Sequence, residues 1–556
     1  MGEVERRIVI VGGSAAGLRC ACRLVRLRPS WSITVVEERE AFSYAACGLP
    51  YVVAGDIEEV DALRRTADGT VRDAAYFAAV KGVTVHPGTR ATAIDVGAQL
   101  LAVVDRDGTA RELPWDELVL ATGATPRRLP GQPSHPRVCT FHVAEDAAPL
   151  YRQLAQGRIG HVAIIGAGLV GCELAEALRA LWGARVTLLE AAAAPLPGVV
   201  DDEIGAVVAA VLRRNGVELR CRATVTAIEV ADDSVVIRTP AETVSADVAI
   251  VAIGVAPAVD LAIAAGVALG PTGAIAVDGH LATSAPGVWA VGDCAEVRHA
   301  VTGEAAYLPL GSLANRQGRT LANVLAGRED SFPPVTGAVA VKVFDCNVAA
   351  AGITRAAARA RGNVARSVWI SAHDCAHYWP EAKEIAVHLV YEPVTERVLG
   401  VQVVGEGEAA KRADVAAQLI ARRATLSELG QLEHSYAPPY APAVEPLAVA
   451  AWVAQNQEDG IIACSPLENL AGEAVLDVRH ADERQERPLA GGGTTALPLE
   501  ELRARGEELG KGPWMAVCER GTRAAETLRW LQAHGRYARY LGGGLRLRAM
   551  ADGGRT

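Results

Sequence analysis

A glycine-rich strand-turn-helix unit occurs twice in this chain and constrains its fold more than any other feature. The first copy has an apolar strand, 7–11, then the turn Gly12-Gly13-Ser14-Ala15-Ala16-Gly17 and a helical run to Arg26. A second strand, 32–36, ends at Glu37. Glycines at 12 and 17 allow a pyrophosphate to approach the start of the helix, and the terminal acid reaches a ribose. Ser14 stands at the middle position of G-x-G-x-x-G, so the flanking elements carry this assignment.

The second copy has the complete glycine pattern. Strand 161–165 leads into Gly166-Ala167-Gly168-Leu169-Val170-Gly171 and a helix, and the next strand, 184–189, ends at Glu190. Two such units predict two dinucleotides, FAD and a nicotinamide coenzyme. Four alanines and no arginine follow Glu190, so nothing there would receive a 2′-phosphate. We therefore expect NADH rather than NADPH.

Two further segments indicate how the first unit is completed. Thr122 and Gly123 lie in the strand-like segment 118–124, and Asp293 ends the apolar strand 287–293. An acid at that position can accept a hydrogen bond from a flavin ribityl hydroxyl. The predicted order is a flavin domain, a nicotinamide insert and a return to the flavin domain.

Composition narrows the class of protein. At 556 residues the chain is too long for one core, and its net charge of −10 argues against nucleic acid or an anionic membrane as a partner. No segment approaches the roughly 20 apolar residues of a membrane span. The first strand begins almost at the start, so we expect no signal peptide. Eleven scattered cysteines then indicate reduced thiols and a cytoplasmic location.

Two cysteines are candidates for chemistry. Cys47 follows the first dinucleotide unit, and position 52 is Val, so there is no Cys-x4-Cys pair. Cys47 would therefore form a disulfide with an external molecule or become a sulfenic acid. Cys518 begins the loop Cys-Glu-Arg-Gly-Thr-Arg, where inward amides and the arginines Arg520 and Arg523 favour a thiolate and stabilise a persulfide.

Four segments together resemble a known family. They are Ser43-Tyr44-Ala45-Ala46-Cys47-Gly48-Leu49-Pro50-Tyr51, Gly292-Asp293, Tyr436-Ala437-Pro438-Pro439-Tyr440 and Cys518–Arg523. The chain resembles coenzyme A-disulfide reductases fused to a rhodanese domain, a group of pyridine nucleotide-disulfide oxidoreductases that includes persulfide reductases. Ala46 replaces a frequent Asn, which removes one polar contact to the thiol or its partner. Leu489–Gly493 replaces Gly-His-Ile-Pro-Gly-Ala, so we expect a different docking surface for the Cys518 loop.

The resemblance implies roles for further residues. Cys47 would form a mixed disulfide with coenzyme A, whose anionic groups Arg23, Arg26 and Ser43 would contact. A homodimer is implied, with Tyr378 and Tyr436 reaching the partner subunit's thiol site. Glu173 would lie near the nicotinamide, and Asp477 and Arg479 would stabilise the Cys518 loop. The run His373-Asp374-Cys375-Ala376-His377 offers too few ligands for a metal, and we expect none.

The expected fold is α/β, with two Rossmann-like dinucleotide-binding domains, an α+β dimerisation domain and a C-terminal rhodanese-like α/β domain. The boundaries are 1–150 and 271–330 for the FAD-binding domain, 151–270 for the NAD-binding domain, 331–456 for the dimerisation domain, 457–473 for a linker and 474–556 for the rhodanese-like domain.

These features predict an enzyme that uses NADH and FAD to reduce coenzyme A persulfide, polysulfide or coenzyme A-disulfide through Cys47, coupled to a sulfurtransferase at Cys518. The alternative is an NADH oxidase or peroxidase that uses a Cys47 sulfenate. A third class, a flavin-binding sensor or scaffold without turnover, is disfavoured by the two dinucleotide motifs. The physiological sulfur acceptor and the direction of transfer between the domains stay open.

Overall fold

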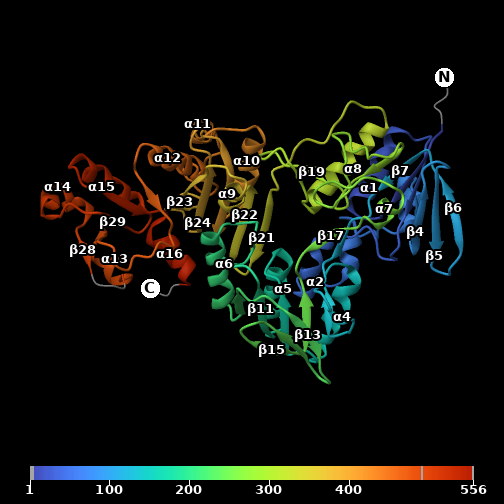
Figure 1. The fold of residues 1–556 in the computed structure, drawn as a ribbon, viewed down its shortest axis with the longest axis horizontal. Coiled ribbons are helices and arrows are strands. Elements are labelled where there is room, and N and C mark those ends of the chain that lie inside the picture. Colours follow the sequence, from blue (N-terminus) through green and yellow to red (C-terminus); the bar gives the residue numbers. More distant parts are fainter. Residues whose placement is uncertain (1–4, 490–492, 554–556) are drawn as a thin grey trace. The chain divides into compact units, whose positions relative to one another are not determined.

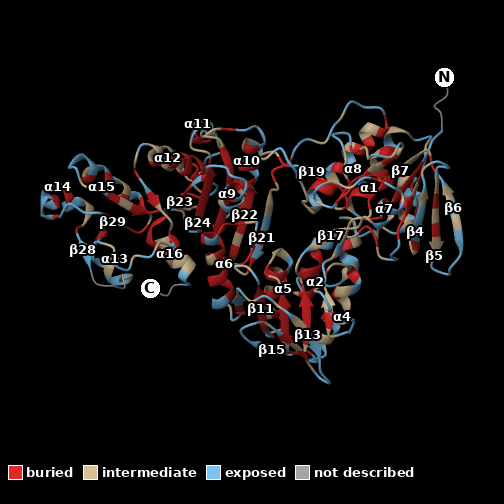
Figure 2. Ribbon diagram, viewed as in Figure 1, coloured by how far each residue is buried: buried red, intermediate tan, exposed pale blue. Residues whose placement is uncertain are grey.

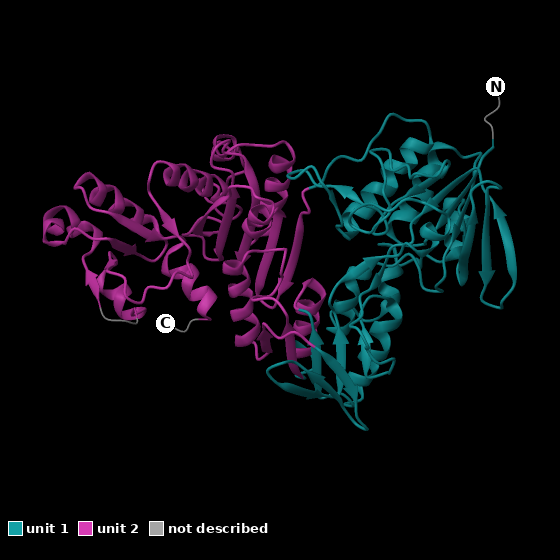
Figure 3. Cartoon of the chain, viewed as in Figure 1, with its two compact units in different colours: residues 1–166, 180–184, 226–335 teal, residues 167–179, 185–225, 336–556 magenta. Residues whose placement is uncertain are grey.

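The computed structural model describes residues 5–489 and 493–553, so part of the segment 489–493 lies outside the described residues (Figure 1). The chain divides into two compact units (Figure 3). Unit 1 holds residues 1–166, 180–184 and 226–335, and unit 2 holds 167–179, 185–225 and 336–556. The expected nicotinamide domain, 151–270, is therefore shared between both units.

Unit 1 is built on a parallel five-stranded sheet in the order β18-β7-β1-β2-β3. Its strands are β1 (Arg7–Val11), β2 (Ser32–Val36), β3 (Thr84–His86), β7 (Glu117–Leu120) and β18 (Val288–Ala290). Helix α1 (Ala15–Leu27) packs against α8 (Gly311–Leu325), and Gly318 permits this contact because a Cβ there would lie 2.2 Å from the Ala16 carbonyl oxygen. The strands, α1 and α8 share one apolar core.

Unit 1 also contains three strands of a second five-stranded sheet and several smaller sheets. Strands β10 (His161–Ile165), β16 (Val248–Val251) and β9 (Val138–Thr140) pair in parallel. Antiparallel sheets are formed by β4 (Thr89–Asp95), β5 (Leu100–Asp105) and β6 (Ala110–Pro114), by β13 (Ala227–Val230), β14 (Val235–Arg238) and β15 (Thr243–Ala246), by β8 (Ala124–Pro126) with β17 (Val255–Pro257), and by β19 (Val297–Arg298) with β20 (Ala305–Ala306). Unit 1 also contains the helices α2 (Leu49–Val53), α3 (Ala74–Tyr76), α4 (Ala144–Ala155) and α7 (Asp260–Ala264).

Unit 2 contains the rest of the second dinucleotide motif and a large antiparallel sheet. Most of α5 (Leu169–Ala180) and all of β11 (Arg185–Glu190), α6 (Asp202–Arg214) and β12 (Glu218–Cys221) belong to it. The large sheet has the order β21-β22-β25-β24-β23. Its strands are β21 (Val339–Val343), β22 (Cys346–Gly352), β23 (Arg366–His373), β24 (Glu384–Tyr391) and β25 (Val398–Gly405), with helices α9 (Arg355–Ala360), α10 (Ala410–Ala421), α11 (Leu426–Gly430) and α12 (Pro446–Glu458).

The central strands of this sheet are buried along almost their whole length (Figure 2). Continuous burial means that both faces are covered, since a half-exposed strand would alternate. Helices α6, α10 and α12 contact the sheet, and so does α16 (Gly544–Asp552) of the C-terminal part. The C-terminal part is thus docked on the same sheet.

The C-terminal part is a parallel five-stranded sheet in the order β26-β30-β29-β27-β28. Its strands are β26 (Ala463–Cys464), β27 (Val475–Asp477), β28 (Thr494–Ala496), β29 (Trp514–Val517) and β30 (Ala538–Leu541), with helices α13 (Ala481–Glu486), α14 (Leu502–Arg505), α15 (Thr522–Ala533) and α16. The segment expected to be a linker, 457–473, begins inside α12 and contains edge strand β26. A two-residue strand leaves no period-two pattern that sequence could show.

Among the helices that the structure describes, none is both long and apolar enough to cross a bilayer.

Candidate functional site

The turn after β1 admits no side chain at two positions. Gly12 has φ +117°, and a Cβ there would lie 2.0 Å from the Ala121 carbonyl oxygen. A Cβ at Gly17 would lie 2.0 Å from the Gly12 carbonyl oxygen. Ser14 occupies the N-cap position of α1 with extended backbone, makes no capping hydrogen bond with its side chain, and is exposed. The start of α1 therefore presents backbone amides that an anionic pyrophosphate can approach.

Glu37, at the end of β2, stabilises this turn. Its carboxylate accepts hydrogen bonds from the Gly13 N–H at 2.7 Å and from the Arg39 N–H at 3.0 Å. Nearby, Thr122 Oγ1 donates to the Ala258 carbonyl at 2.6 Å, and Gly123 has φ +71°. All of these expected flavin-site residues lie in unit 1.

Asp293 and its surroundings fit a polar ligand with several hydroxyl groups. Burial raises the pKa of Asp293 to about 6. The preceding Gly292 N–H donates to Gln317 Oε1 at 2.8 Å, while Gln317 Nε2 and the Tyr307 hydroxyl are buried without a hydrogen-bond partner. Burial, and then the charge of Asp293, raises the pKa of Tyr307. Buried polar groups without partners are costly, so this site suits a group such as the ribityl chain and ring edge of FAD.

Cys47 lies in the short turn Ala46–Gly48 just before α2, and it is exposed. A Cβ built on Gly311 would lie 4.0 Å from Cys47 Sγ. Because Gly311 is the first residue of α8, the sulfur lies beside the N-terminus of a 15-residue helix. The positive end of a helix dipole stabilises a thiolate, which is the reactive form of cysteine.

The arginines expected to bind coenzyme A lie on α1. Arg23 Nε donates to Asn323 Oδ1 at 3.0 Å, and Arg26 is exposed. Burial, followed by the charges of Arg319, Arg328 and Arg26, lowers the pKa of Arg23. Helices α1 and α8 thus carry a group of like charges.

Ser43, the third residue expected to contact coenzyme A, has a different environment from the two arginines. It is buried, has φ +57°, and donates its N–H to the Gly13 carbonyl at 3.0 Å. This contact fixes the segment before Cys47 to the glycine turn.

The second glycine turn repeats the geometry of the first. Gly166 has φ +103°, and a Cβ there would lie 2.5 Å from the Ala252 carbonyl oxygen. Nothing lies within 4 Å of a Cβ at Gly168, while Gly171 is buried in α5. Glu190 is buried and accepts from the Ala167 and Ala192 N–H groups, each at 2.7 Å. Its carboxylate disfavours a neighbouring phosphate.

Glu173 lies in α5, two residues after Gly171, and its acidic side chain is half-buried. Burial, and then the neighbouring Glu176, raises the pKa of Glu173 to about 7. Glu176 is itself engaged, because it accepts from Lys342 Nζ and from the Phe344 N–H, each at 2.6 Å. Glu173 can therefore hold or release a proton near neutral pH.

The hydroxyls of Tyr378 and Tyr436 lie 3.5 Å apart, and both side chains are exposed. The hydrogen bond to Tyr436 raises the pKa of Tyr378. The structure thus brings together the two phenols that the resemblance assigns to the partner's thiol site.

Cys518 lies at the end of β29 in a loop lined by backbone amides. Its sulfur accepts from the Gly521 N–H at 3.1 Å and the Ala524 N–H at 3.4 Å, and the residue is only 1% exposed. Gly521 has φ +92°, which turns the loop into α15. This is a cradle for an anionic sulfur.

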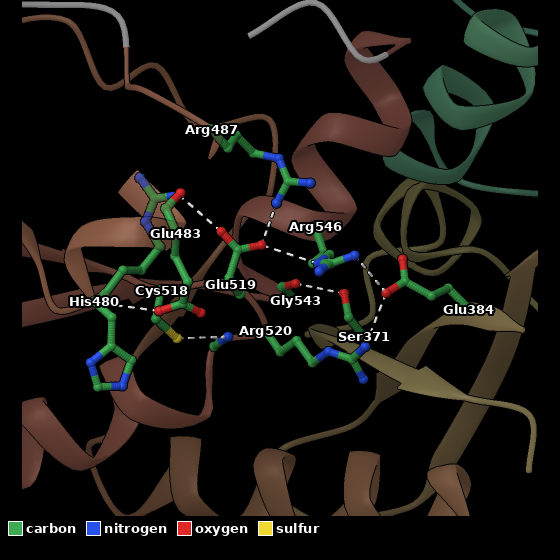
Figure 4. Close-up of polar contacts among 12 residues, drawn as sticks. Ser371, Glu384, His480, Glu483, Arg487, Cys518, Glu519, Arg520, Gly543 and Arg546 are labelled. Carbon is green, nitrogen blue, oxygen red and sulfur yellow. Dashed lines mark hydrogen bonds and ion pairs between the residues drawn. The ribbon is translucent and has the colours of Figure 1, made fainter. Parts of the chain in front are cut away.

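The two loop arginines differ in direction. Arg523 Nη1 donates to Glu483 Oε2 at 2.7 Å, and this hydrogen bond is the main cause that lowers the pKa of Glu483 to about 2. Arg520 instead extends away from the sulfur toward Glu384 (Figure 4), and its guanidinium group also contacts the His373 ring. The sequence expectation placed both arginines around Cys518.

A buried ion-pair network supports the loop from behind. Arg479 is fully buried and pairs with Asp477 and with Glu519, each at 2.9 Å. Removing one member of such a network would leave a charge buried without its partner.

Among the described residues, including the run 373–377, no group of three or more His, Cys, Asp or Glu is placed to hold a metal ion.

Three residues that lie beside the expected site residues could not be predicted from the local sequence. Gly311 beside Cys47, Glu483 beside Arg523 and Glu384 beside Arg520 all come from segments remote in the chain. None stands in a recognisable motif.

The chain matches two family models. Residues 6–309 match the pyridine nucleotide-disulphide oxidoreductase model, and residues 338–448 match the dimerisation domain of the same family. A relative from Pyrococcus abyssi, named NAD(P)H sulfur oxidoreductase (CoA-dependent), is 34% identical over 81% of this chain and 98% of its own. An NADH oxidase from Methanocaldococcus jannaschii is 30% identical over 80% of this chain and 98% of its own.

Two solved structures match almost the whole chain. An NAD-dependent persulfide reductase from A. fulgidus has a TM-score of 0.93 and 37% identity, and covers 97% of this chain and 99% of its own. Reduced CoADR-RHD from Bacillus anthracis has a TM-score of 0.90 and 30% identity, and covers 99% of this chain and 98% of its own. The similarity therefore includes the C-terminal part.

Proposed function

Because the chain belongs to the pyridine nucleotide-disulphide oxidoreductase family, we propose that it uses NADH and FAD to reduce a persulfide, polysulfide or disulfide of coenzyme A through Cys47. One observation carries this proposal. A single chain holds two thiols in anion-stabilising settings, Cys47 beside the start of α8 and Cys518 within its amide-lined loop. A disulfide reductase without sulfur transfer needs only the first.

When bound, NADH would supply the electron pair for the reaction and FAD would pass it to the thiol site. Gly12, Ser14, Gly17, Glu37, Thr122, Gly123 and Asp293 would hold FAD, and Gly166, Gly168, Gly171 and Glu190 would hold NADH. Glu173, with its raised pKa of about 7, can keep a proton close to the coenzyme site near neutral pH.

The Cys47 thiolate attacks the coenzyme A sulfur of the persulfide, forming a Cys47–coenzyme A disulfide and releasing hydrosulfide. Two electrons and one proton then cleave that disulfide to the Cys47 thiolate and coenzyme A thiol. The sum is CoA–SSH + NADH + H⁺ → CoA–SH + H₂S + NAD⁺. In this scheme Arg23, Arg26 and Ser43 bind coenzyme A, and Tyr378 and Tyr436 of a homodimer act at the partner's thiol.

At the second site, the Cys518 thiolate accepts the outer sulfur of a donor persulfide and releases the donor thiolate. The resulting Cys518 persulfide can pass that sulfur to coenzyme A thiol, which regenerates Cys518 and forms the substrate of Cys47. Assignment of 474–556 as a rhodanese-like sulfurtransferase, the other domain boundaries and the cytoplasmic location are parts of this proposal.

An NADH oxidase that cycles through a Cys47 sulfenate is the second candidate. The similarity to the M. jannaschii oxidase supports it, but that match covers 80% of this chain, whereas the match to the persulfide reductase structure covers 97%. Parallel assays of NADH oxidation with coenzyme A persulfide, coenzyme A-disulfide, peroxide and oxygen test the choice. Preferred turnover of the persulfide supports the proposal, and preferred turnover of oxygen or peroxide contradicts it.

A further inference from the structure

Arg520 belongs to the Cys518 loop by sequence but not by its side-chain contacts. The guanidinium group lies 3.0 Å from both ring nitrogens of His373, and its Nη2 donates to Glu384 Oε1 at 2.9 Å. The loop sulfur is held instead by backbone amides of Gly521 and Ala524. Arg520 is thus engaged outside the cradle.

His373 and Glu384 offer a paired acceptor on the large antiparallel sheet of unit 2. They are direct cross-strand neighbours, His373 at the end of β23 and Glu384 at the start of β24. A neutral imidazole has one lone pair, so only one of its two contacts with Arg520 can be a hydrogen bond. Burial, and then the charge of Arg520, lowers the pKa of His373, which keeps the ring neutral and able to accept.

Glu384 also binds a second arginine of the C-terminal part. Arg546 Nη1 donates to the same Glu384 Oε1 at 3.0 Å, and Arg546 Nε donates to Glu519 Oε2 at 3.1 Å (Figure 4). The backbone of Arg546 donates to the Glu519 carbonyl at 2.9 Å. One carboxylate on β24 therefore holds the loop through Arg520 and the start of α16 through Arg546.

The contact between Arg520 and Glu384 lies where the C-terminal part packs closely against the large antiparallel sheet of unit 2. Ser371 Oγ donates to the Gly543 carbonyl at 2.6 Å, and a Cβ at Gly544 would lie 2.4 Å from the Glu519 carbonyl oxygen. Glu519 is the neighbour of Cys518, so a movement of this junction moves the residue next to the sulfur.

We infer that His373 and Glu384 are positioning residues for the Cys518 site, which act by holding Arg520 and so keep the loop closed around the sulfur. The inference rests on the proposed sulfur-transfer role of Cys518. It assigns Arg520 to loop placement and leaves the backbone amides of Gly521 and Ala524 as the groups that bind the sulfur.

The test measures how fast N-ethylmaleimide alkylates Cys518 in the full-length protein, quantified by mass spectrometry of the Cys518 peptide. Releasing the loop exposes a thiol that is 1% exposed in the closed state. We expect Arg520→Ala and Glu384→Gln each to accelerate alkylation about tenfold, within the range for coupled contacts. The double variant should be accelerated by less than the product of the two single effects, because both substitutions remove the shared contact between Arg520 and Glu384. Unchanged rates in both single variants, or multiplied effects in the double variant, would overturn the inference.

Two further variants separate positioning from general loss of structure. Arg520→Lys keeps the charge and should recover part of the slow alkylation. Arg505→Ala removes an exposed arginine that pairs with Glu508 in the same domain and should leave the rate unchanged. Acceleration by Arg505→Ala, or no recovery with Arg520→Lys, would show that the effect is not specific to this contact.

Sulfur uptake gives a second readout. With a persulfide donor, Glu384→Gln and His373→Gln should lower kcat of sulfur uptake more than they raise KM, because they displace the loop and not the donor-binding groups. A larger change in KM than in kcat would contradict the inference. If wild-type Cys518 takes up no sulfur, the proposed function fails at this site, while the alkylation rates still decide whether Glu384 holds the loop.

Discussion

Arg520 Nη2 donates to Glu384 Oε1 at 2.9 Å, although 136 residues separate them in the chain. This contact joins the Cys518 loop to the sheet matched by the family's dimerisation model. The Cys518 loop is therefore held in place by contacts with another part of unit 2. Its reactivity should respond to substitutions on β23 and β24 as well as to those in the loop.

Glu190 should set the choice of nicotinamide coenzyme. Its carboxylate accepts from the Ala167 and Ala192 N–H groups and lies where a 2′-phosphate would be repelled. Glu190→Ala with Ala191→Arg should raise the ratio of kcat/KM for NADPH over NADH roughly ten- to hundredfold, the range of a charge-assisted contact. Steady-state kinetics with both coenzymes measure this. A wild-type enzyme that already uses both equally would contradict the assignment.

Asp293 should hold the flavin. Its partly buried carboxyl can accept from ligand hydroxyls, and the adjacent Tyr307 hydroxyl is buried without a partner. Asp293→Leu should yield protein with substoichiometric FAD, and Asp293→Asn should retain more because the amide oxygen still accepts. The flavin absorbance per chain measures the loss. Asp233→Asn, at a fully exposed acid, is the control and should retain full flavin.

The raised pKa of Glu173 predicts a pH-dependent stability difference. Its pKa is about 7 in the folded protein, against an ordinary value of 4.5. Below pH 4.5 the group is protonated in both states, so it costs nothing. As pH rises from 4.5 to 7, ionisation favours the unfolded state, and the cost then stays constant. Glu173→Gln should therefore be more stable than wild type at pH 8, by roughly 1 to 3 kcal/mol.

Thermal unfolding of both proteins at pH 8 and pH 5 measures this difference. The advantage of Glu173→Gln should be largest at pH 8 and shrink at pH 5. An equal advantage at both pH values would show that ionisation of Glu173 is not the cause.

Arg523 and Glu483 should act as a unit at the Cys518 sulfur. Arg523, on which the charge of Cys518 acts, pairs with Glu483, so Arg523→Ala leaves the Glu483 carboxylate without its arginine partner and its negative charge opposes a persulfide anion at Cys518. Sulfur uptake should slow in this variant and recover in part when Glu483→Gln is added, because the repelling charge is then removed. Rapid-quench mass spectrometry of Cys518 measures the uptake. Equal rates in the single and double variants would contradict this role.

Local patterns in the sequence were enough to predict the strands and helices that surround the two glycine turns. Strands β1, β2 and β10 begin and end as their apolar runs predict, and the glycines and terminal acids mark the turns. These features depend on neighbours in the chain. The family resemblance assigns Tyr378 and Tyr436 to the partner subunit's thiol site, and the structure places their hydroxyls 3.5 Å apart.

Contacts between remote segments were not predictable in this way. The position of Gly311 beside Cys47 depends on how α8 packs on α1, and the direction of Arg520 depends on a carboxylate at the start of β24. Strand β26 was missed because two residues leave no periodic pattern, and it was assigned to a linker. The charge of a loop shows which ions it can bind, but not which of its side chains face inward.

The central claim is that Cys47 carries electrons to a sulfur substrate that Cys518 can supply. The most direct test measures anaerobic NADH oxidation with coenzyme A persulfide in wild type, Cys47→Ser and Cys518→Ser, with Cys139→Ser as the control. Cys47→Ser should lose hydrosulfide release, whereas Cys518→Ser should keep it with coenzyme A persulfide but lose it when sulfur is offered only as a donor persulfide with catalytic coenzyme A. Full turnover of coenzyme A persulfide by Cys47→Ser would contradict the account.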